Sequence, residues 1–317
     1  MSLDRVRWAY RARTALRFAF GLLVACSGAL ASAQQEPPAE EKIPAPEDIV
    51  LPTKDMLQLT CTFYPGTKKK ESVPVVLLHD YKGNRRDWEN LALQLQKEQG
   101  FAVIVPDLRG HGDSTNKGTQ KLEATGMAPQ EFQLMYKIDL ERVKTFLMEK
   151  HNAGQLNIDK LSVCGCGMGA LVGMLWSAQD WSWPILATGK QGQDVKAVAM
   201  ISPDFAFKSL SMAEVPAVAG GAVREVQSRI SIYITCGASD SKALGEATRV
   251  NNLFKVGHQL KKDEDKDLFF DKTMKTKLQS TKLLSEKSLP VAERIIEFLD
   301  LRAASQPFPW VERRTQF

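Results

Sequence analysis

A glycine-rich stretch of ten residues restricts the fold more than any other part of this chain. It reads LSVCGCGMGA over residues 161–170, an apolar run that meets glycine at every second position from 165 to 169. Glycine adopts left-handed backbone angles without a steric penalty, so the run predicts a buried strand that turns sharply into a helix. Gly165 and Gly169 would let the strand and the helix pack closely. Gly167 lies at the tip of the predicted turn.

The segments around this turn alternate between two kinds of pattern. Continuous apolar runs, typical of buried parallel strands, occupy residues 75–78 and 101–105, and mostly apolar strand patterns occupy residues 195–201 and 230–235. Between and after them, apolar residues recur at helical spacing, as in 88–95, 136–147 and the final segment 291–299. Strand and helix in alternation predict an α/β fold, with a mostly parallel central sheet and helices on both faces.

Three features of this pattern resemble one known family. They are the glycine turn, His79 directly after the first strand, and the loop DLRGHGDS at residues 107–114. Together they resemble the α/β-hydrolase fold, and most closely its lysophospholipase and serine-aminopeptidase-like branch, over about residues 48–301. The resemblance implies that the turn is a nucleophile elbow, with the spacing small-x-nucleophile-x-small. The segment between Pro203 and Arg229 is short, which predicts a small lid or none.

The catalytic positions that the resemblance implies are altered. The nucleophile position holds Gly167, which has no side chain. The acid position, after the strand 230–235, holds Asp240, which fits either a vestigial catalytic acid or a helix cap. The base position, in the loop before the last helix, holds Gln279, and an amide does not titrate near neutral pH. No intact catalytic residue is therefore expected.

The oxyanion and pocket positions implied by the resemblance are His79, Asp80, Tyr81 and Met168. Asp80 departs from the family, which usually has glycine there. A carboxylate would oppose the negative charge of a tetrahedral intermediate, unless Asp80 points to solvent and only shapes a turn. His79 is expected to order the rim of the pocket.

These departures favour a catalytically inactive protein. Loss of a triad nucleophile or base typically lowers turnover by about a million-fold. We therefore predict a hydrolase-like protein that binds an unknown small molecule or protein partner. The alternative is an active carboxylic-ester or amide hydrolase with a non-standard nucleophile. Cys166 is the neighbouring candidate, but it should point away from the nucleophile position.

The N-terminal residues resemble a bacterial secretory signal. Five arginines precede an apolar run at residues 18–25, and the small-x-small site Ala31-Ser32-Ala33 follows. We predict a signal peptide over 1–33, a flexible linker over 34–47, the hydrolase-like domain over 48–301 and a C-terminal tail over 302–317. The protein would be exported, to the periplasm or beyond. The alternative cleavage site, at Leu23-Val24-Ala25-Cys26, would give a lipoprotein anchored through Cys26.

Charge and residue spacing exclude several classes of function. The whole chain has 42 basic and 37 acidic residues, and removal of residues 1–33, with five arginines and one aspartate, leaves 37 and 36. A net charge near +1 does not favour nucleic acid as a partner.

No metal-ligand spacing and no cofactor motif is present, so neither a metal nor a cofactor is expected. No membrane span is expected after signal cleavage. The four histidines include His151 and His258, predicted at helix ends on the surface.

Two aromatic segments stand outside the strand pattern, at residues 181–184 and 307–310. Aromatic side chains in loops either dock onto their own domain or form a surface for a partner. The sequence favours docking, and exposure would favour a partner surface.

Overall fold

The computed structural model describes residues 43–187, 189–258 and 267–313. The chain divides into two units, Met1–Ile43 and Pro44–Phe317, and nearly all of the described residues belong to the second. The predicted signal peptide, Cys26 and most of the predicted linker lie outside the described residues. In the described part, no helix is both long and apolar enough to cross a membrane.

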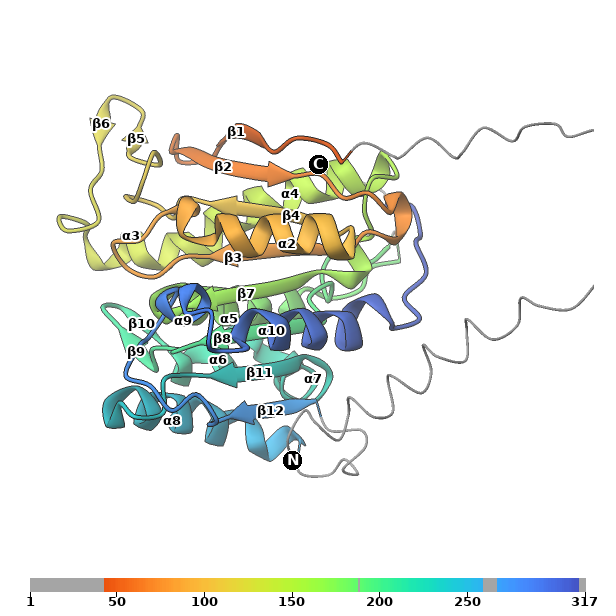
Figure 1. The fold of residues 1–317 in the computed structure, drawn as a ribbon. Helices are drawn as coiled ribbons and strands as arrows, with labels where there is room; N and C mark the ends of the chain where they lie inside the picture. Colours follow the sequence, from red (N-terminus) through yellow and green to blue (C-terminus); the bar gives the residue numbers. More distant parts are fainter. Residues whose placement is uncertain (1–42, 188, 259–266, 314–317) are drawn as a thin grey trace, which may run out of the picture. The chain divides into compact units, whose positions relative to one another are not determined.

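The Pro44–Phe317 unit is built on an eight-stranded sheet (Figure 1), which confirms the predicted mostly parallel architecture. The strand order is β1-β2-β4-β3-β7-β8-β11-β12. Only β2 runs against the others, because it pairs antiparallel with both β1 and β4. The strands of this sheet are β1 (Glu47–Pro52), β2 (Gln58–Tyr64), β3 (Pro74–Leu78), β4 (Ala102–Pro106), β7 (Ser162–Cys166), β8 (Ala197–Ile201), β11 (Ser231–Thr235) and β12 (Leu268–Asp271).

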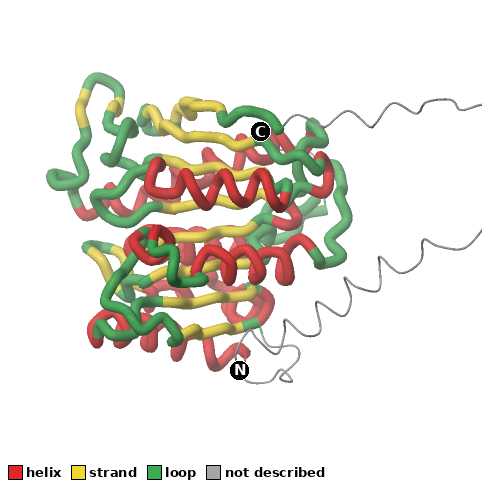
Figure 2. Tube along the Cα trace, in the orientation of Figure 1, coloured by secondary structure: helices red, strands yellow, loops and turns green. Residues whose placement is uncertain are grey.

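Helices cover both faces of the sheet, as the pattern predicts (Figures 1 and 2). Helices α2 and α10 lie in front of the sheet in Figure 1, and α4 and α5 lie behind it. The helices are α2 (Glu89–Gln99), α3 (Pro129–Leu134), the π-helical turn η3 (Met135–Asp139), α4 (Leu140–Asn152), α5 (Gly167–Ser182), α6 (Val215–Ala219), α7 (Val223–Arg229), α8 (Ser241–His258), α9 (Lys282–Ser285) and α10 (Val291–Leu299). Two short hairpins, β5–β6 (Asn116–Lys117 and Gln120–Lys121) and β9–β10 (Ala206–Phe207 and Leu210–Ser211), lie outside the sheet.

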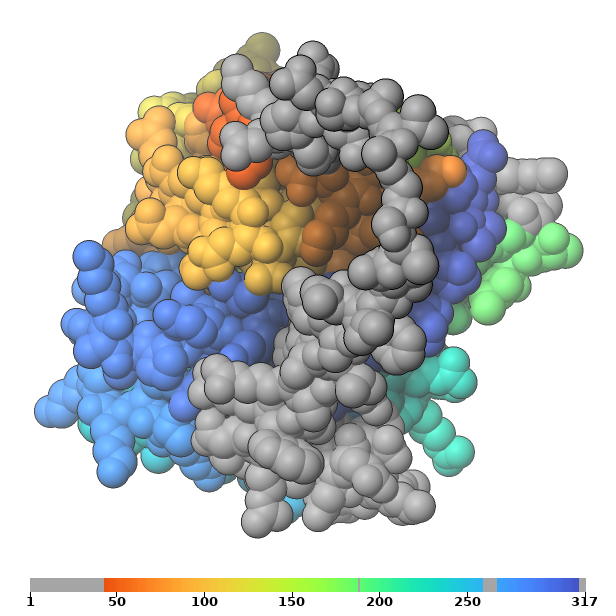
Figure 3. Space-filling view, turned by 45° about the vertical axis from the view of Figure 1, so that its right-hand side comes forward, coloured from red at the N-terminus to blue at the C-terminus, as the bar shows by residue number. Residues whose placement is uncertain are grey.

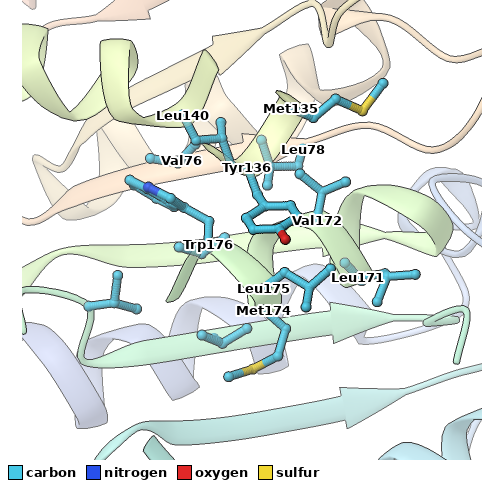
Figure 4. Packing of buried hydrophobic residues seen from close by; sticks show 14 of the residues in the cluster. Val76, Leu78, Met135, Tyr136, Leu140, Leu171, Val172, Met174, Leu175 and Trp176 are labelled. Carbon is cyan, nitrogen blue, oxygen red and sulfur yellow. The ribbon is translucent and has the colours of Figure 1, made fainter. Parts of the chain in front are cut away.

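Helix α5 is the centre of the hydrophobic core. It follows β7 without a break, and fourteen of its sixteen residues are buried. Figure 4 shows its side chains Val172 and Trp176 among residues of β3 and of the η3–α4 segment. A helix buried on all sides reads as continuously apolar, which explains why residues 168–178 show little amphipathic pattern.

The C-terminal tail docks onto the domain, as the sequence favoured. The Trp310 indole N–H donates to the carbonyl of His151 at 3.2 Å, and the His151 imidazole bonds the carbonyl of Val311 at 2.8 Å. The tail therefore covers His151, which is fully buried. The predicted surface position of His151 is wrong for this reason. His258, at the end of α8, is also buried, so that prediction is wrong as well.

We expect Gly169→Ala to destabilise the protein strongly. A β-carbon at Gly169 would lie 2.4 Å from the carbonyl oxygens of Leu78 and His79, so β3 and α5 would have to separate. Overpacking of this kind costs about 1–3 kcal/mol. Urea denaturation should show the corresponding loss in the free energy of unfolding.

The matched control is Gly245→Ala in helix α8, where a β-carbon meets no atom within 4 Å. There alanine should raise stability by up to about 1 kcal/mol, through its higher helix propensity. Equal effects at the two glycines would contradict the close packing of β3 against α5.

Candidate functional site

The predicted elbow is a tight turn between β7 and α5. Gly167 is the first residue of α5 and has a φ of 48°, in the left-handed region. Gly165 is also required by packing, because a β-carbon there would lie 2.6 Å from the backbone nitrogen of Ala170. The tight turn and the close packing predicted for an elbow are therefore present, and the position predicted for the nucleophile is a glycine without a side chain.

The Asp80 carboxylate fills the space beside Gly167. A β-carbon built on Gly167 would lie 2.1–2.5 Å from the two oxygens and the carboxyl carbon of Asp80. Oδ1 of Asp80 accepts the backbone N–H of Tyr81 at 2.7 Å and that of Met168 at 3.0 Å. The carboxylate thus turns in towards the elbow, rather than out to solvent.

Two N–H groups that converge on one oxygen form the arrangement that stabilises an oxyanion. One of them, from Met168, lies in the first turn of the 16-residue helix α5, where the helix dipole also favours negative charge. In this chain the oxygen belongs to Asp80. An oxyanion-type site is therefore occupied by the chain's own carboxylate.

His79 links two strand ends and has no free ring nitrogen. Its Nδ1–H donates to the Asp80 carbonyl at 2.7 Å, and its Nε2 accepts the Leu108 N–H at 2.9 Å. Burial lowers the pKa of His79 to about 4, so the ring is neutral near pH 7. His79 holds the end of β3 against the loop after β4, and it has no nitrogen left to act as a base.

Tyr81 and Met168 contribute backbone groups rather than side-chain chemistry. The Tyr81 ring packs against Phe207 of β9, with centroids 4.8 Å apart, and against His111 at 5.6 Å. The Met168 side chain is fully buried in the core. The rim of the site is thus partly aromatic.

Gln279 is bound at both ends of its amide. Its Oε1 accepts the Ser202 hydroxyl at 2.6 Å and the Gly237 N–H at 3.2 Å, and its Nε2 donates to the Gly237 carbonyl at 2.9 Å. Ser202 directly follows β8, in which Ile201 pairs with Cys166 beside the elbow. Gln279 therefore ties together the ends of β8 and β11 next to the turn.

Asp240 caps helix α8. Its Oδ1 accepts the backbone N–H groups of Lys242 and Ala243 at 3.0 and 3.1 Å. Among the described residues, no hydrogen bond joins Asp240 to Gln279. Of the two roles that the sequence allows, the observed bonds correspond to the helix cap.

A second carboxylate near the elbow was not predicted from the sequence. The Asp204 N–H donates to the Gly167 carbonyl at 3.3 Å, and burial together with the Asp80 and Glu246 carboxylates raises the pKa of Asp204 to about 6. The available signal was its position, because Asp204 follows the predicted strand 195–201 at the same sheet edge. The edge is negative, which opposes the development of further negative charge.

Neither a cysteine nucleophile nor a metal site is formed around the elbow. Cys166 is fully buried in β7, and burial raises the pKa of its thiol well above the usual value. A thiol of this kind is inert, because the thiolate is the reactive form. Within the described ranges, no group of three histidine, cysteine, aspartate or glutamate side chains is placed to hold a metal ion.

We expect Gly167→Ala to destabilise the protein through Asp80. The new β-carbon would displace the carboxylate from its two N–H donors, a loss of about 1.5–3 kcal/mol, and would add about 1–2 kcal/mol for the left-handed backbone. In an Asp80→Gly background only the backbone part should remain. Chemical denaturation of the four proteins in this cycle measures the difference.

Gly118→Ala is the control for backbone strain alone. Gly118 has a φ of 58°, and a β-carbon there would meet only the Met56 side chain, at 3.5 Å. It should cost about 1–2 kcal/mol whether or not Asp80 is present. Additive effects of Gly167→Ala and Asp80→Gly would disprove the contact between these two positions.

Comparison with known proteins identifies the family to which this architecture belongs. In solved structures the same fold occurs in an esterase from Pyrococcus furiosus, with 17% identity, a TM-score of 0.52, and coverage of 82% of this chain and 93% of the esterase. It also occurs in a carboxyl esterase from Bacillus coagulans, with 11% identity, a TM-score of 0.55, and coverage of 82% and 99%. At these identities the likeness concerns the fold.

A search among curated proteins returned no match. A sequence profile of the alpha/beta hydrolase fold family matches residues 73–241, more than half of the chain. The chain belongs to the alpha/beta hydrolase fold family.

Proposed function

We propose that this protein is an exported, catalytically silent member of the family, which acts by binding rather than by turnover. One observation carries the proposal. The Asp80 carboxylate occupies the space of a side chain at Gly167, and it accepts the two N–H groups that would otherwise stabilise an oxyanion. We assign Gly167, Asp240 and Gln279 to the vestigial positions of nucleophile, acid and base.

The chemistry of acyl transfer fails at each step at this elbow. Gly167 has no atom that can attack a carbonyl carbon. Gln279 does not titrate near neutral pH, and both ends of its amide are already bonded. A substrate carbonyl that entered the N–H pair would have to displace one carboxylate and develop negative charge near Asp204. The missing nucleophile, the missing base and the occupied N–H pair affect one catalytic unit, so their effects on turnover are not additive. Any one of them is sufficient to abolish useful turnover.

The alternative, an active ester or amide hydrolase with a non-standard nucleophile, has less support. The structural neighbours are called esterases, and that activity concerns those proteins. The burial of Cys166 and the raised pKa of its thiol disfavour the nearest substitute nucleophile. The loop 107–114 resembles that of the lysophospholipase and serine-aminopeptidase-like branch, which supports descent of the site from that branch. The resemblance does not identify a substrate.

Export is the second part of the proposal. It rests on the five arginines, the apolar run 18–25 and the small-x-small site before Gln34. The lipoprotein alternative, with Cys26 as the modified residue, rests on the four residues 23–26. Both routes place the compact unit on the far side of the cytoplasmic membrane.

We expect the purified protein to remain unlabelled by a serine-reactive fluorophosphonate probe and not to hydrolyse p-nitrophenyl acetate above the buffer rate. A matched variant tests the site. The triple substitution Asp80→Gly, Gly167→Ser and Gln279→His frees the N–H pair and supplies a nucleophile and a base. It should gain labelling, whereas Gly167→Ser alone should not, because Asp80 still fills the position.

Clear labelling or turnover by the unmodified chain would overturn the proposal. A Cys166→Ala variant then separates a cysteine nucleophile from any other group. A folded triple variant without labelling would instead show that the elbow has lost the geometry of a hydrolase site.

Export should be visible in the mass of the processed protein. When the full chain is expressed with its N-terminus in a Gram-negative host, the mature protein should begin near Gln34. Intact-mass and N-terminal peptide analysis of the periplasmic fraction measures this directly. A diacylglyceryl group on Cys26 would establish the lipoprotein route, and an unprocessed cytoplasmic chain would contradict export.

A further inference from the structure

The segment after helix α5 turns its apolar side chains outward. Between α5 and β8, Trp183, Ile185 and Leu186 are 42%, 64% and 41% exposed. We call these three side chains the apolar tip. In Figure 3 the green part of the chain, which corresponds to this region on the colour bar, projects from the right-hand side of the molecule.

Backbone groups at the base of the same loop are hydrogen-bonded to buried side chains and to helix α5. Oδ2 of Asp180 accepts the N–H groups of Asp194 and Val195 at 2.6 and 3.0 Å, and the Asp180 carbonyl accepts the N–H of Gln193 at 2.8 Å. The Gln191 carbonyl accepts from Lys144 at 3.2 Å. These buried hydrogen bonds hold the backbone at the base of the loop in place.

The charges beneath the loop neutralise one another. Three basic side chains are bonded to three acidic ones, and the Arg313 pairs also bind the C-terminal tail to this base. The pairs are Lys144 with Asp180 and Asp194, Lys190 with Asp159 and Asp194, and Arg313 with Asp159 and Asp194. The apolar tip therefore stands on a base of ion pairs of both signs, with Lys196 beside them, so the net charge at this end of the sheet is small.

The tip lies at the edge of the sheet opposite the elbow. Helix α5 begins at the elbow and runs for 16 residues, about 24 Å, before Trp183. The described chain starts at this same edge, because the Pro44 carbonyl accepts from Gln96 near the end of α2, just before β4 begins.

We propose that the apolar tip docks the compact unit onto the surface of a lipid bilayer. Tryptophan favours the headgroup level of a membrane, and isoleucine and leucine favour the acyl boundary. Three half-exposed side chains offer much less area than a stable protein–protein interface buries, which disfavours a second copy of this chain as the occupant. The neutral base predicts that docking depends on apolar contact rather than on lipid charge.

The test uses the chain from Gln34 onwards, which keeps the whole compact unit and its core. It is sedimented with sucrose-loaded vesicles of phosphatidylcholine, with and without 20–30% phosphatidylglycerol as a rough range for an anionic membrane. We expect binding to both, little changed by 0.5 M salt, a concentration of roughly three times the physiological value. Trp183→Ser with Ile185→Ser and Leu186→Ser should weaken binding by at least about tenfold.

The matched control replaces two apolar side chains that are equally exposed elsewhere. Val50→Ser with Met56→Ser, at 53% and 64% exposure, should leave vesicle binding unchanged. Trp183→Phe, made in a Trp310→Phe background because Trp310 is partly exposed, should keep binding but lose most of the fluorescence quenching by brominated phosphatidylcholine, since Trp88, Trp176 and Trp181 are buried. Circular dichroism checks that each variant is folded.

Several outcomes would overturn the proposal. One is the absence of vesicle binding by the unmodified chain. Another is binding that requires anionic lipid, disappears in salt and survives the triple substitution. A third is a dimer, seen by light scattering, that the triple substitution dissociates without any lipid binding. None of these outcomes depends on whether the elbow is catalytic, so this proposal and the proposed function fail separately.

Discussion

Two hydrogen bonds, from the backbone N–H groups of Tyr81 and Met168 to the Asp80 carboxylate, determine which side chains the elbow can accommodate. They join the loop after β3 to the first turn of α5, and they place the carboxylate in the space that a side chain at position 167 would need. A side chain at position 167 and the carboxylate at position 80 exclude each other, since the two would lie within 2.5 Å. Gly167 and Asp80 therefore depend on each other, because the carboxylate can accept these two N–H groups only while position 167 has no side chain.

Gln279, at the position proposed for the base, is also held by hydrogen bonds. An imidazole at position 279 could not donate and accept at the backbone of Gly237 as the amide of Gln279 does, while also accepting from Ser202. The amide joins the ends of β8 and β11, and it cannot transfer a proton near neutral pH. Asp240 is likewise bonded to the N-terminal turn of α8. If these are the vestigial catalytic positions, as proposed, each one now holds the edge of the sheet together, which is the direction of the common exchange between stability and activity.

The parts of the fold that follow from local pattern could be predicted from the sequence. The strand 75–78, the final helix 291–299 and the elbow depend on apolar runs and on glycine, and the structure places them within a residue or two of the expected bounds. The direction of the Asp80 side chain could not be predicted, because one of its donors lies 88 residues away. The burial of His151 depends on a tail 159 residues further on, and its position at a helix end gives no sign of this. Local pattern determines the elements, and distant partners determine what their side chains do.

The two edges of the sheet satisfy their polar groups by different means, and this separates their possible roles. At the elbow, the half-buried Asp80 carboxylate accepts the two N–H groups, and the half-buried Asp204 lies close by. At the opposite edge, ion pairs around Asp180 and Asp194 satisfy the polar groups and leave Trp183, Ile185 and Leu186 facing outward. If the elbow performs no turnover, as proposed, no substrate path is required there. Contact with a lipid surface, as proposed, is then favoured where exposed apolar side chains meet a base of small net charge, and the edge that carries Trp183 has both.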